Sequence, residues 1–187
     1  MKKLFSLLVV ALISVSAFAQ SEEETFFVTP KVGFNIASIT DVDNADPKFG
    51  LVVGAEAGYQ MTEKLAFTGG LLYSMQGAKA DAITGDVSCK YNYLNVPVLI
   101  NYYVWKSLAI KAGFEVGFNL SAKDDDLDVK DNMKGTVFAI PVGASYEFNN
   151  FVVDARYNIG ASKIFDTDVL DSKNSVFQFT LGYKFAL

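Results

Sequence analysis

The sequence has 187 residues, of which 51% are hydrophobic and 14% aromatic, and its formal net charge is −5. This acidic balance disfavours nucleic acid as a partner, because phosphate binding needs a basic surface. Cys89 is the single cysteine, which excludes an intramolecular disulfide, and the lack of any histidine excludes every catalytic triad or dyad that uses an imidazole base.

The chain begins with the features of a secretory signal peptide. Lys2 and Lys3 precede a short apolar run over 4–15, and small residues follow up to Ala19. The apolar run is shorter than the roughly 20 residues that a membrane-spanning helix needs. We therefore predict a signal peptide over 1–19. Its removal leaves 14 basic residues against 21 acidic ones, a net charge of −7.

A polar lead over 20–26, expected in the periplasm, is followed by segments in which apolar residues alternate with small or polar ones. Alternation with a period of two predicts β-strands, and no segment shows helical spacing. Eight such runs can be distinguished, at 27–39, 49–61, 65–77, 91–104, 108–121, 136–148, 151–163 and 175–187.

The connections between these runs alternate in length. Short turns follow the second, fourth and sixth runs, at 62–64, 105–107 and 149–150. Longer, Asp-rich segments such as TDVDNADPK and KDDDLDVKDNMK follow the first and fifth runs, and long connections are also expected after the third and seventh. This pattern predicts an all-β fold, an eight-stranded antiparallel up-and-down β-barrel over 27–187. Whether it is a transmembrane β-barrel depends on which face of its strands points outward.

Alternation alone does not decide which face of the barrel points inward. A soluble or periplasmic lipocalin-like barrel would place its apolar face inside, around a small apolar ligand, whereas a membrane barrel would place it outside. Glycine favours the second alternative, because small residues relieve crowding inside an eight-stranded barrel. Ten of the 14 glycines lie on the polar face, at Gly33, Gly50, Gly54, Gly58, Gly70, Gly113, Gly117, Gly143, Gly160 and Gly182.

The polar face also carries charged residues, four of each sign. They are Lys31, Glu56, Lys111, Glu115, Glu147, Asp154, Arg156 and Lys184. Because an unpaired buried charge is costly, we expect a neutral network within the lumen, in which Lys111 and Arg156 neutralise Glu115, Glu147 or Asp154.

Aromatic residues on the apolar face gather near both ends of the runs, as in the aromatic girdles at the two interfaces of a membrane. Beside the short turns we predict a girdle of Tyr59, Tyr102, Tyr146, Phe148, Tyr183 and Phe185. Nearer the long connections lie Phe34, Phe49, Tyr73 and Phe118.

Four segments carry a family resemblance: LLYSMQGAK (71–79), YNYLNVPVLINYYV (91–104), FVVDARYNIGAS (151–162) and FQFTLGYKF (177–185). They resemble the small outer-membrane β-barrel proteins of Bacteroidota-type Gram-negative bacteria, and the fold is similar to the OmpA/OmpX type. The resemblance implies a location in the outer membrane, in contact with its lipid, and insertion by the barrel assembly machinery. That machinery would read the last strand, whose alternating apolar residues are Phe177, Phe179, Leu181, Tyr183, Phe185 and Leu187.

Other chemistry finds little support in the sequence. Cys89 has no histidine base and is expected in a loop, and Glu115 and Glu147 are better explained as members of the charge network than as an acid and base pair. The Asp-rich segment from Asp124 fails the calcium-loop pattern, because its sixth and twelfth positions hold Val129 and Gly135. We expect no catalytic, cofactor-binding or metal-binding residue.

An open pore is also disfavoured, since channels come with roughly 16 or more strands. We therefore expect a filled polar lumen and a structural or surface-contact role through acidic extracellular loops, with an extracellular partner that the sequence does not identify.

Overall fold

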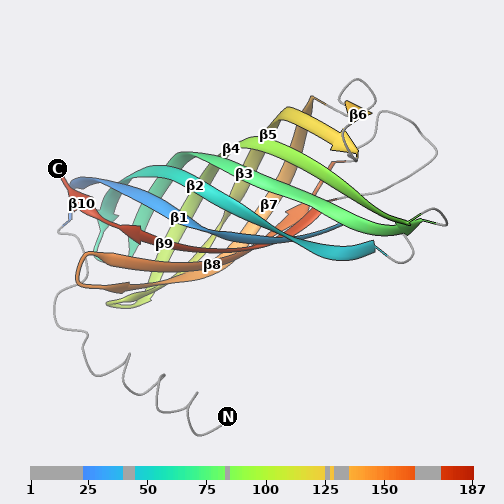
Figure 1. The fold of residues 1–187 in the computed structure, drawn as a ribbon. Helices are drawn as coiled ribbons and strands as arrows, with labels where there is room; N and C mark the ends of the chain where they lie inside the picture. The colour runs from blue at the N-terminus through green and yellow to red at the C-terminus, as the bar shows by residue number, and fades with distance from the viewer. Residues whose placement is uncertain (1–22, 40–44, 83–84, 125–126, 129–134, 163–173) are drawn as a thin grey trace, which may run out of the picture.

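The computed structural model describes residues 23–39, 45–82, 85–124, 127–128, 135–162 and 174–187 of the chain. Within them, one antiparallel sheet closes into a barrel (Figure 1). The barrel strands are β1 (Thr25–Ile39), β2 (Ala45–Thr62), β3 (Leu65–Ala82), β4 (Gly85–Trp105), β5 (Leu108–Asp124), β7 (Thr136–Phe148), β8 (Phe151–Gly160) and β9 (Asn174–Tyr183), with β10 (Phe185–Ala186) continuing β9. The predicted eight-stranded fold is therefore confirmed.

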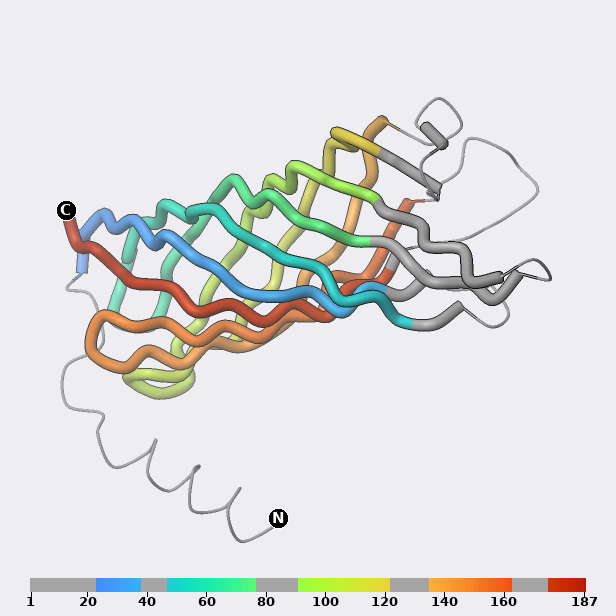
Figure 2. Tube along the Cα trace, viewed as in Figure 1, coloured from blue at the N-terminus to red at the C-terminus, as the bar shows by residue number. Residues whose placement is uncertain are grey.

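The chain order of the strands is also their order around the barrel, which is the up-and-down topology. The barrel closes where β1 pairs with β9 and β10, so that β1 has a hydrogen-bonded neighbour on both sides. Following paired residues once around leads from Thr25 through Lys111 and back to β1 at Asn35, ten residues farther along. This displacement requires the strands to tilt relative to the barrel axis, as Figure 2 shows.

The two ends of the barrel differ. At the end that we call the turn end, tight turns join β2 to β3, β4 to β5 and β7 to β8, and the C-terminus lies beside them (Figure 1). The β7–β8 turn holds Asn149 at a φ of 50°, a left-handed conformation that asparagine tolerates better than most residues. We call the opposite end the loop end.

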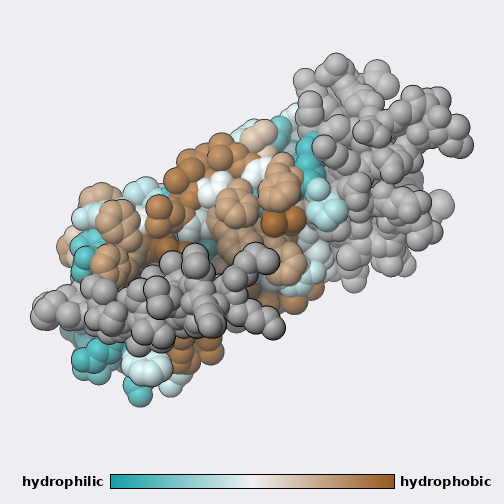
Figure 3. Space-filling model, turned by 60° about the horizontal axis from the view of Figure 1, so that its bottom comes forward, coloured by the Kyte–Doolittle hydropathy of each residue, from teal (hydrophilic) through white to brown (hydrophobic). Residues whose placement is uncertain are grey.

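Alternate side chains face inward and outward along every barrel strand, and the polar set faces inward. On β8, for example, Asp154 is fully buried while Val153 is 53% exposed. The outer surface accordingly carries large exposed apolar side chains from every barrel strand, and Figure 3 shows apolar residues on the face of the barrel that is in view.

Several predicted boundaries need correction, and β2 and β5 extend to Ala45 and Asp124 at the loop end. Strands β3 and β4 continue to Ala82 and Gly85, so the long connection expected after the third run is a paired hairpin. Cys89, expected in a loop, lies in β4 with Ala78 as its partner in β3. β1 begins at Thr25, which places part of the predicted lead in the barrel, and β8 ends at Gly160.

The structure adds one strand that the sequence did not suggest. β6 (Leu127–Asp128) pairs with the loop end of β5, outside the barrel circuit. Among the described residues, none belongs to a helix that is long and apolar enough to cross a membrane.

Candidate functional site

All eight charged residues of the predicted network are buried on the lumen side of the barrel, with exposures between 0% and 9%. They are not one continuous network of direct contacts. Five of them form a cluster, which we call the central cluster: Lys31, Glu56, Lys111, Asp154 and Arg156. Two others form a separate ion pair, and Glu115 lies apart from both.

In the central cluster, three cations surround two carboxylates. Asp154 accepts hydrogen bonds from Arg156 Nε at 2.9 Å, from Lys111 Nζ at 2.5 Å and from Lys31 Nζ at 3.2 Å. Glu56 accepts from Lys31 Nζ at 2.6 Å and from Arg156 Nη2 at 2.7 Å. These contacts span the lumen, because the five residues come from β1, β2, β5 and β8.

The separate ion pair joins Lys184 to Glu147 at the turn end of the lumen. Lys184 Nζ lies 2.9 Å and 3.0 Å from the two carboxylate oxygens of Glu147, and the Tyr103 hydroxyl donates to the same carboxylate at 2.6 Å. The Lys184 ammonium also lies 4.3 Å from the centroid of the Phe27 ring, a cation–π contact. Lys184 sits in the break between β9 and β10, from which its side chain reaches β7, β4 and β1.

Glu115 has a different environment from the other carboxylates. Its Oε1 accepts from Asn95 Nδ2 at 2.8 Å and from Asn158 Nδ2 at 3.4 Å, and among the described residues it forms no ion pair. The central cluster has one more cation than carboxylate, and the formal charge of Glu115 is equal and opposite to that excess. The hypothesised partners therefore need correction: Lys111 and Arg156 contact Asp154, but not Glu115 or Glu147.

The glycines on the lumen face make room for these side chains. A Cβ atom at Gly143 would lie 2.7 Å from Arg156 Cβ, and one at Gly70 would lie 2.6 Å from Glu56 Cγ. A Cβ atom at Gly182 would lie 2.9 Å from Lys31 Cγ. Real Cβ atoms do not approach other atoms this closely, so each glycine keeps space for a member of the central cluster.

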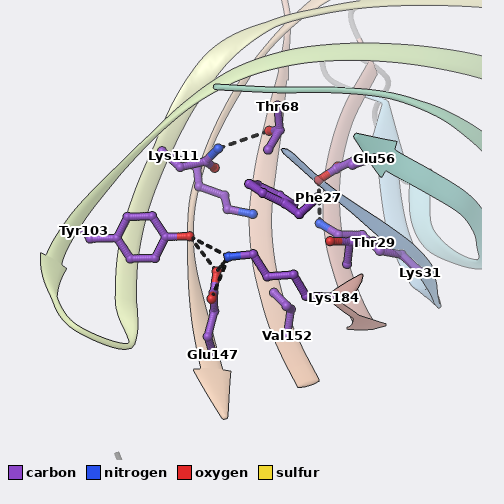
Figure 4. Close-up of a pocket in the computed structure, with 11 residues that line it drawn as sticks. Phe27, Thr29, Lys31, Glu56, Thr68, Tyr103, Lys111, Glu147, Val152 and Lys184 are labelled. Atoms are coloured by element: carbon purple, nitrogen blue, oxygen red, sulfur yellow. Dashed lines mark hydrogen bonds and ion pairs between the residues drawn. The ribbon is translucent and has the colours of Figure 1, made fainter. Parts of the chain in front are cut away.

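A small cavity separates the central cluster from the Lys184–Glu147 pair (Figure 4). Its volume is about 20 Å³, and residues of both groups line it. Asn101 also lines the cavity: its Nδ2 donates to the Thr68 hydroxyl at 3.1 Å, while its Oδ1 is buried without a protein partner. Leaving such an acceptor unsatisfied costs ~1–3 kcal/mol.

On the outer face, the predicted turn-end girdle is arranged as follows. Tyr102, Tyr183 and Phe185 are exposed, while Tyr59, Tyr146 and Phe148 are half-buried against their neighbours. Tyr183 packs edge-on against Phe151 and also contacts Phe185.

The sequence analysis did not identify three aromatic residues near the turn end, two on the outer face and one in the lumen. Phe26 contacts the Tyr59 ring at a centroid distance of 4.6 Å, and Trp105 is 72% exposed at the β4–β5 turn. Phe26 falls in the predicted lead over 20–26 and Trp105 in the predicted turn over 105–107, although Phe26 is in phase with Val28. Tyr103, which hydrogen bonds to Glu147, had a clear signal, because it alternates with Asn101 on the lumen face of the fourth run.

Near the loop end, Phe34 contacts both Phe49 and Phe179, and Tyr157 contacts Phe177. The alternating residues of the predicted assembly signal, Phe177, Phe179, Leu181, Tyr183, Phe185 and Leu187, all face outward and are exposed. The outer surface thus has aromatic residues toward both ends and aliphatic residues such as Val98 and Ile100 between them.

The chemistry of the lumen is that of neutralised, hydrogen-bonded charges. Glu115 and Glu147 have separate sets of partners and do not form a carboxylate pair. Within the described ranges, no group of three or more His, Cys, Asp or Glu residues could hold a metal ion. Asp41 and Asp43, in the Asp-rich segment after the first run, lie outside the described residues.

A closed antiparallel barrel with an apolar outer band and aromatic residues at both ends defines a transmembrane β-barrel. The sequence matches the model of the family described as "Outer membrane protein beta-barrel domain" over residues 5–185, and the chain belongs to this family. The predicted location in the outer membrane is thereby confirmed, and the alternative of a soluble lipocalin-like barrel is wrong. Its apolar face would point inward, whereas here that face is exposed.

Solved structures of other outer-membrane proteins share the fold. Neisserial surface protein A superposes with a TM-score of 0.57 at 16% identity, covering 86% of this chain and 97% of that chain. Ail of Yersinia pestis, in complex with the heparin analogue sucrose octasulfate, gives a TM-score of 0.54 at 16% identity, with coverages of 87% and 99%. OprG from Pseudomonas aeruginosa gives 0.51 at 16% identity, with coverages of 90% and 99%. No curated protein matches in sequence.

Proposed function

We propose that this protein is a closed, non-conducting outer-membrane barrel that has a structural or surface-contact role through its acidic loops. The observation that carries the proposal is the unequal height of the barrel wall. The β5–β7 pairing ends at Phe118, whereas the β4–β5 pairing continues to Asp124 and the β3–β4 pairing to Ala82. One side of the wall therefore extends beyond the other at the loop end, where Figure 1 shows β3 and β4 reaching farthest.

A closed lumen is supported by the contacts of the central cluster. Lys31, Arg156 and Lys111 reach across the lumen to carboxylates on other strands, and the Lys184–Glu147 pair lies below them toward the turn end. In planar bilayers we expect the purified protein to show no stable single-channel conductance. A steady conductance in wild-type protein would contradict the closed lumen.

The charge of the loop sequences indicates the class of partner. KDDDLDVKDNMK and TDVDNADPK each carry more acidic than basic residues. A polyanion such as the heparin analogue bound by Ail is therefore a poor candidate, and we propose a partner with a positively charged surface. We expect the protein to bind an immobilised polylysine surface but not heparin. This binding should be lost in roughly 0.5 M salt, because salt at that concentration screens charges over a few ångströms.

The decisive experiment distinguishes a role in surface contact from a purely structural role in the envelope. A strain lacking the gene is complemented with wild-type protein or with a variant in which Asp124, Asp125, Asp126 and Asp128 are replaced by Asn. If the loops make the contact, the variant restores envelope integrity but not adhesion to cationic surfaces. Full restoration of both by the variant would leave only the structural role. A matched control replaces Glu63, in a turn at the opposite end, by Gln.

Three narrower proposals accompany this role. The absence of histidine and the ion pairs of Glu56 and Glu147 support a role without catalysis. The four family-like segments support a Bacteroidota-type origin. The outward-facing apolar residues of β9 and β10 support recognition of this last strand by the barrel assembly machinery. Replacing Phe185 by Ser should then reduce the amount of protein in the outer membrane, and unchanged levels would contradict that recognition.

A further inference from the structure

The cavity between the two charge groups is lined by polar and apolar side chains of several strands. Thr29, Thr68, Asn101, Lys111 and Lys184 line it together with the apolar side chain of Val152. Figure 4 shows Lys111 pointing into the space between Thr68 and the Lys184–Glu147 pair. A volume of about 20 Å³ exceeds the ~10–15 Å³ that one water molecule requires.

The hydrogen-bonding groups at this cavity do not balance within the protein. The Lys111 ammonium has three N–H groups and donates to Asp154 alone, so two N–H donors lack a described acceptor. Asn101 Oδ1 is a buried acceptor without a protein donor. A residue with surplus donors and a residue with an unpartnered acceptor thus line the same cavity.

This combination selects one kind of occupant. A metal cation is disfavoured, because three ammonium groups, those of Lys31, Lys111 and Lys184, line the cavity. An anion could accept from Lys111 but has no proton to donate, so Asn101 Oδ1 would stay unpartnered. Water both donates and accepts, and 2–4 polar partners are what a buried water needs.

We propose that this cavity binds one structural water molecule, which accepts a hydrogen bond from Lys111 and donates one to Asn101 Oδ1. Such a water lies between the central cluster and the Lys184–Glu147 pair. It therefore extends the direct ion contacts of the lumen by a hydrogen-bonded link toward the turn end. The proposal concerns the lumen alone and does not depend on the role of the loops.

The test replaces Val152, an aliphatic lining residue, and leaves every polar group in place. Val152→Ile adds one methyl group toward the cavity, whereas Val153→Ile adds the same group on the lipid-facing side of the same strand. Both variants and the wild type are refolded in detergent micelles, and long-lived internal water is measured by deuteron relaxation dispersion. We expect Val152→Ile to lose the contribution of one internal water, and Val153→Ile to match the wild type.

The unfolding midpoint in urea gives a second readout with opposite signs for the two possibilities. Displacing a hydrogen-bonded water leaves Asn101 Oδ1 unsatisfied, so Val152→Ile should shift the folding equilibrium toward the unfolded state by about tenfold. Filling an empty cavity would instead raise the midpoint. A raised midpoint, or a relaxation dispersion identical to that of the wild type, overturns the proposal. A lowered midpoint with unchanged dispersion also overturns it, because that result reports overpacking alone.

Discussion

The lumen and the outer surface of this barrel are built from alternate residues of the same strands, but they are stabilised in different ways. On the outer surface, Val153 is exposed and needs only to be apolar, because it has no specific hydrogen-bond or ion-pair partner to contact. In the lumen, Asp154 accepts hydrogen bonds from cations on β1, β5 and β8, and each of these contacts needs a defined distance. The outer surface should therefore tolerate exchanges of one apolar residue for another, while the lumen should tolerate few changes of any kind.

The largest effect is expected from breaking the central cluster. Arg156→Leu removes one of the two donors that join Asp154 to Glu56 and leaves both buried carboxylates with fewer partners. We expect the free energy of unfolding to fall by ~3–5 kcal/mol, the usual loss when one member of a buried ion pair is removed. Urea unfolding in lipid vesicles measures it.

Lys64→Leu is the matched control for that variant, because Lys64 is an exposed cation in the β2–β3 turn. It should change the free energy of unfolding by less than ~0.5 kcal/mol. Equal losses in the two variants would show that the contacts of Arg156 add nothing beyond those of a surface charge.

The next effect tests the outer surface. Val98→Arg places a charge in the middle of the lipid-facing band of β4, where Val98 is exposed. We expect a loss of ~2–4 kcal/mol in bilayers, the depth-dependent cost of arginine near the midplane. The loss should grow with bilayer thickness.

Asn101→Arg, on the lumen side of the same strand, provides the contrast. Asn101 is buried against Ala66 and Thr68, so a larger cation is limited by space and pairing rather than by lipid. Its effect should be independent of bilayer thickness. If both variants respond alike to thickness, or if the wild type folds stably without any amphiphile, the assignment of the two faces is wrong.

The smallest effect on stability is expected from replacing glycine by alanine, and it should differ in sign between the lumen face and the outer face. Gly143→Ala puts a Cβ atom against the Ala155 carbonyl and Arg156, and overpacking of this kind costs ~1–3 kcal/mol. At Gly69, which faces outward, the nearest atom to a Cβ would be the Pro97 oxygen at 3.8 Å. Gly69→Ala should therefore stabilise the protein by ~0.4–1 kcal/mol, since alanine restricts the unfolded chain. Two shifts of the same sign in the unfolding midpoint would contradict the difference between the faces.

Much of the fold could be predicted because one signal, alternation, repeats in every strand. The positions of Lys31 and Asp154 on the polar phase were enough to suggest a shared lumen. Their contact was not predictable, because the two residues are 123 positions apart and meet only through the tilt and closure of the barrel. The isolation of Glu115 was hidden for the same reason: which cation a carboxylate reaches depends on the height of each strand, not on its phase.

The errors have a common physical origin as well. Alternation of apolar and polar residues arises where one face of a strand meets lipid. The hairpin around Cys89 lies beyond the predicted runs, where the sequence loses that pattern, yet its backbone groups remain paired between β3 and β4. Periodicity therefore detects the part of a strand that crosses the membrane and does not detect the part that continues beyond it.

The position of Lys31 on the first strand bears on the order of events during assembly. Its carboxylate partners lie on β2 and on β8, and Asp154 on β8 also needs Lys111 from β5. An unfinished barrel that ends before β8 holds these cations without Asp154, and one that has not yet joined β1 to β9 keeps Lys31 away from it. The Lys31–Asp154 and Arg156–Glu56 contacts join the first two strands to β8, so the finished circuit of strands brings these partners together.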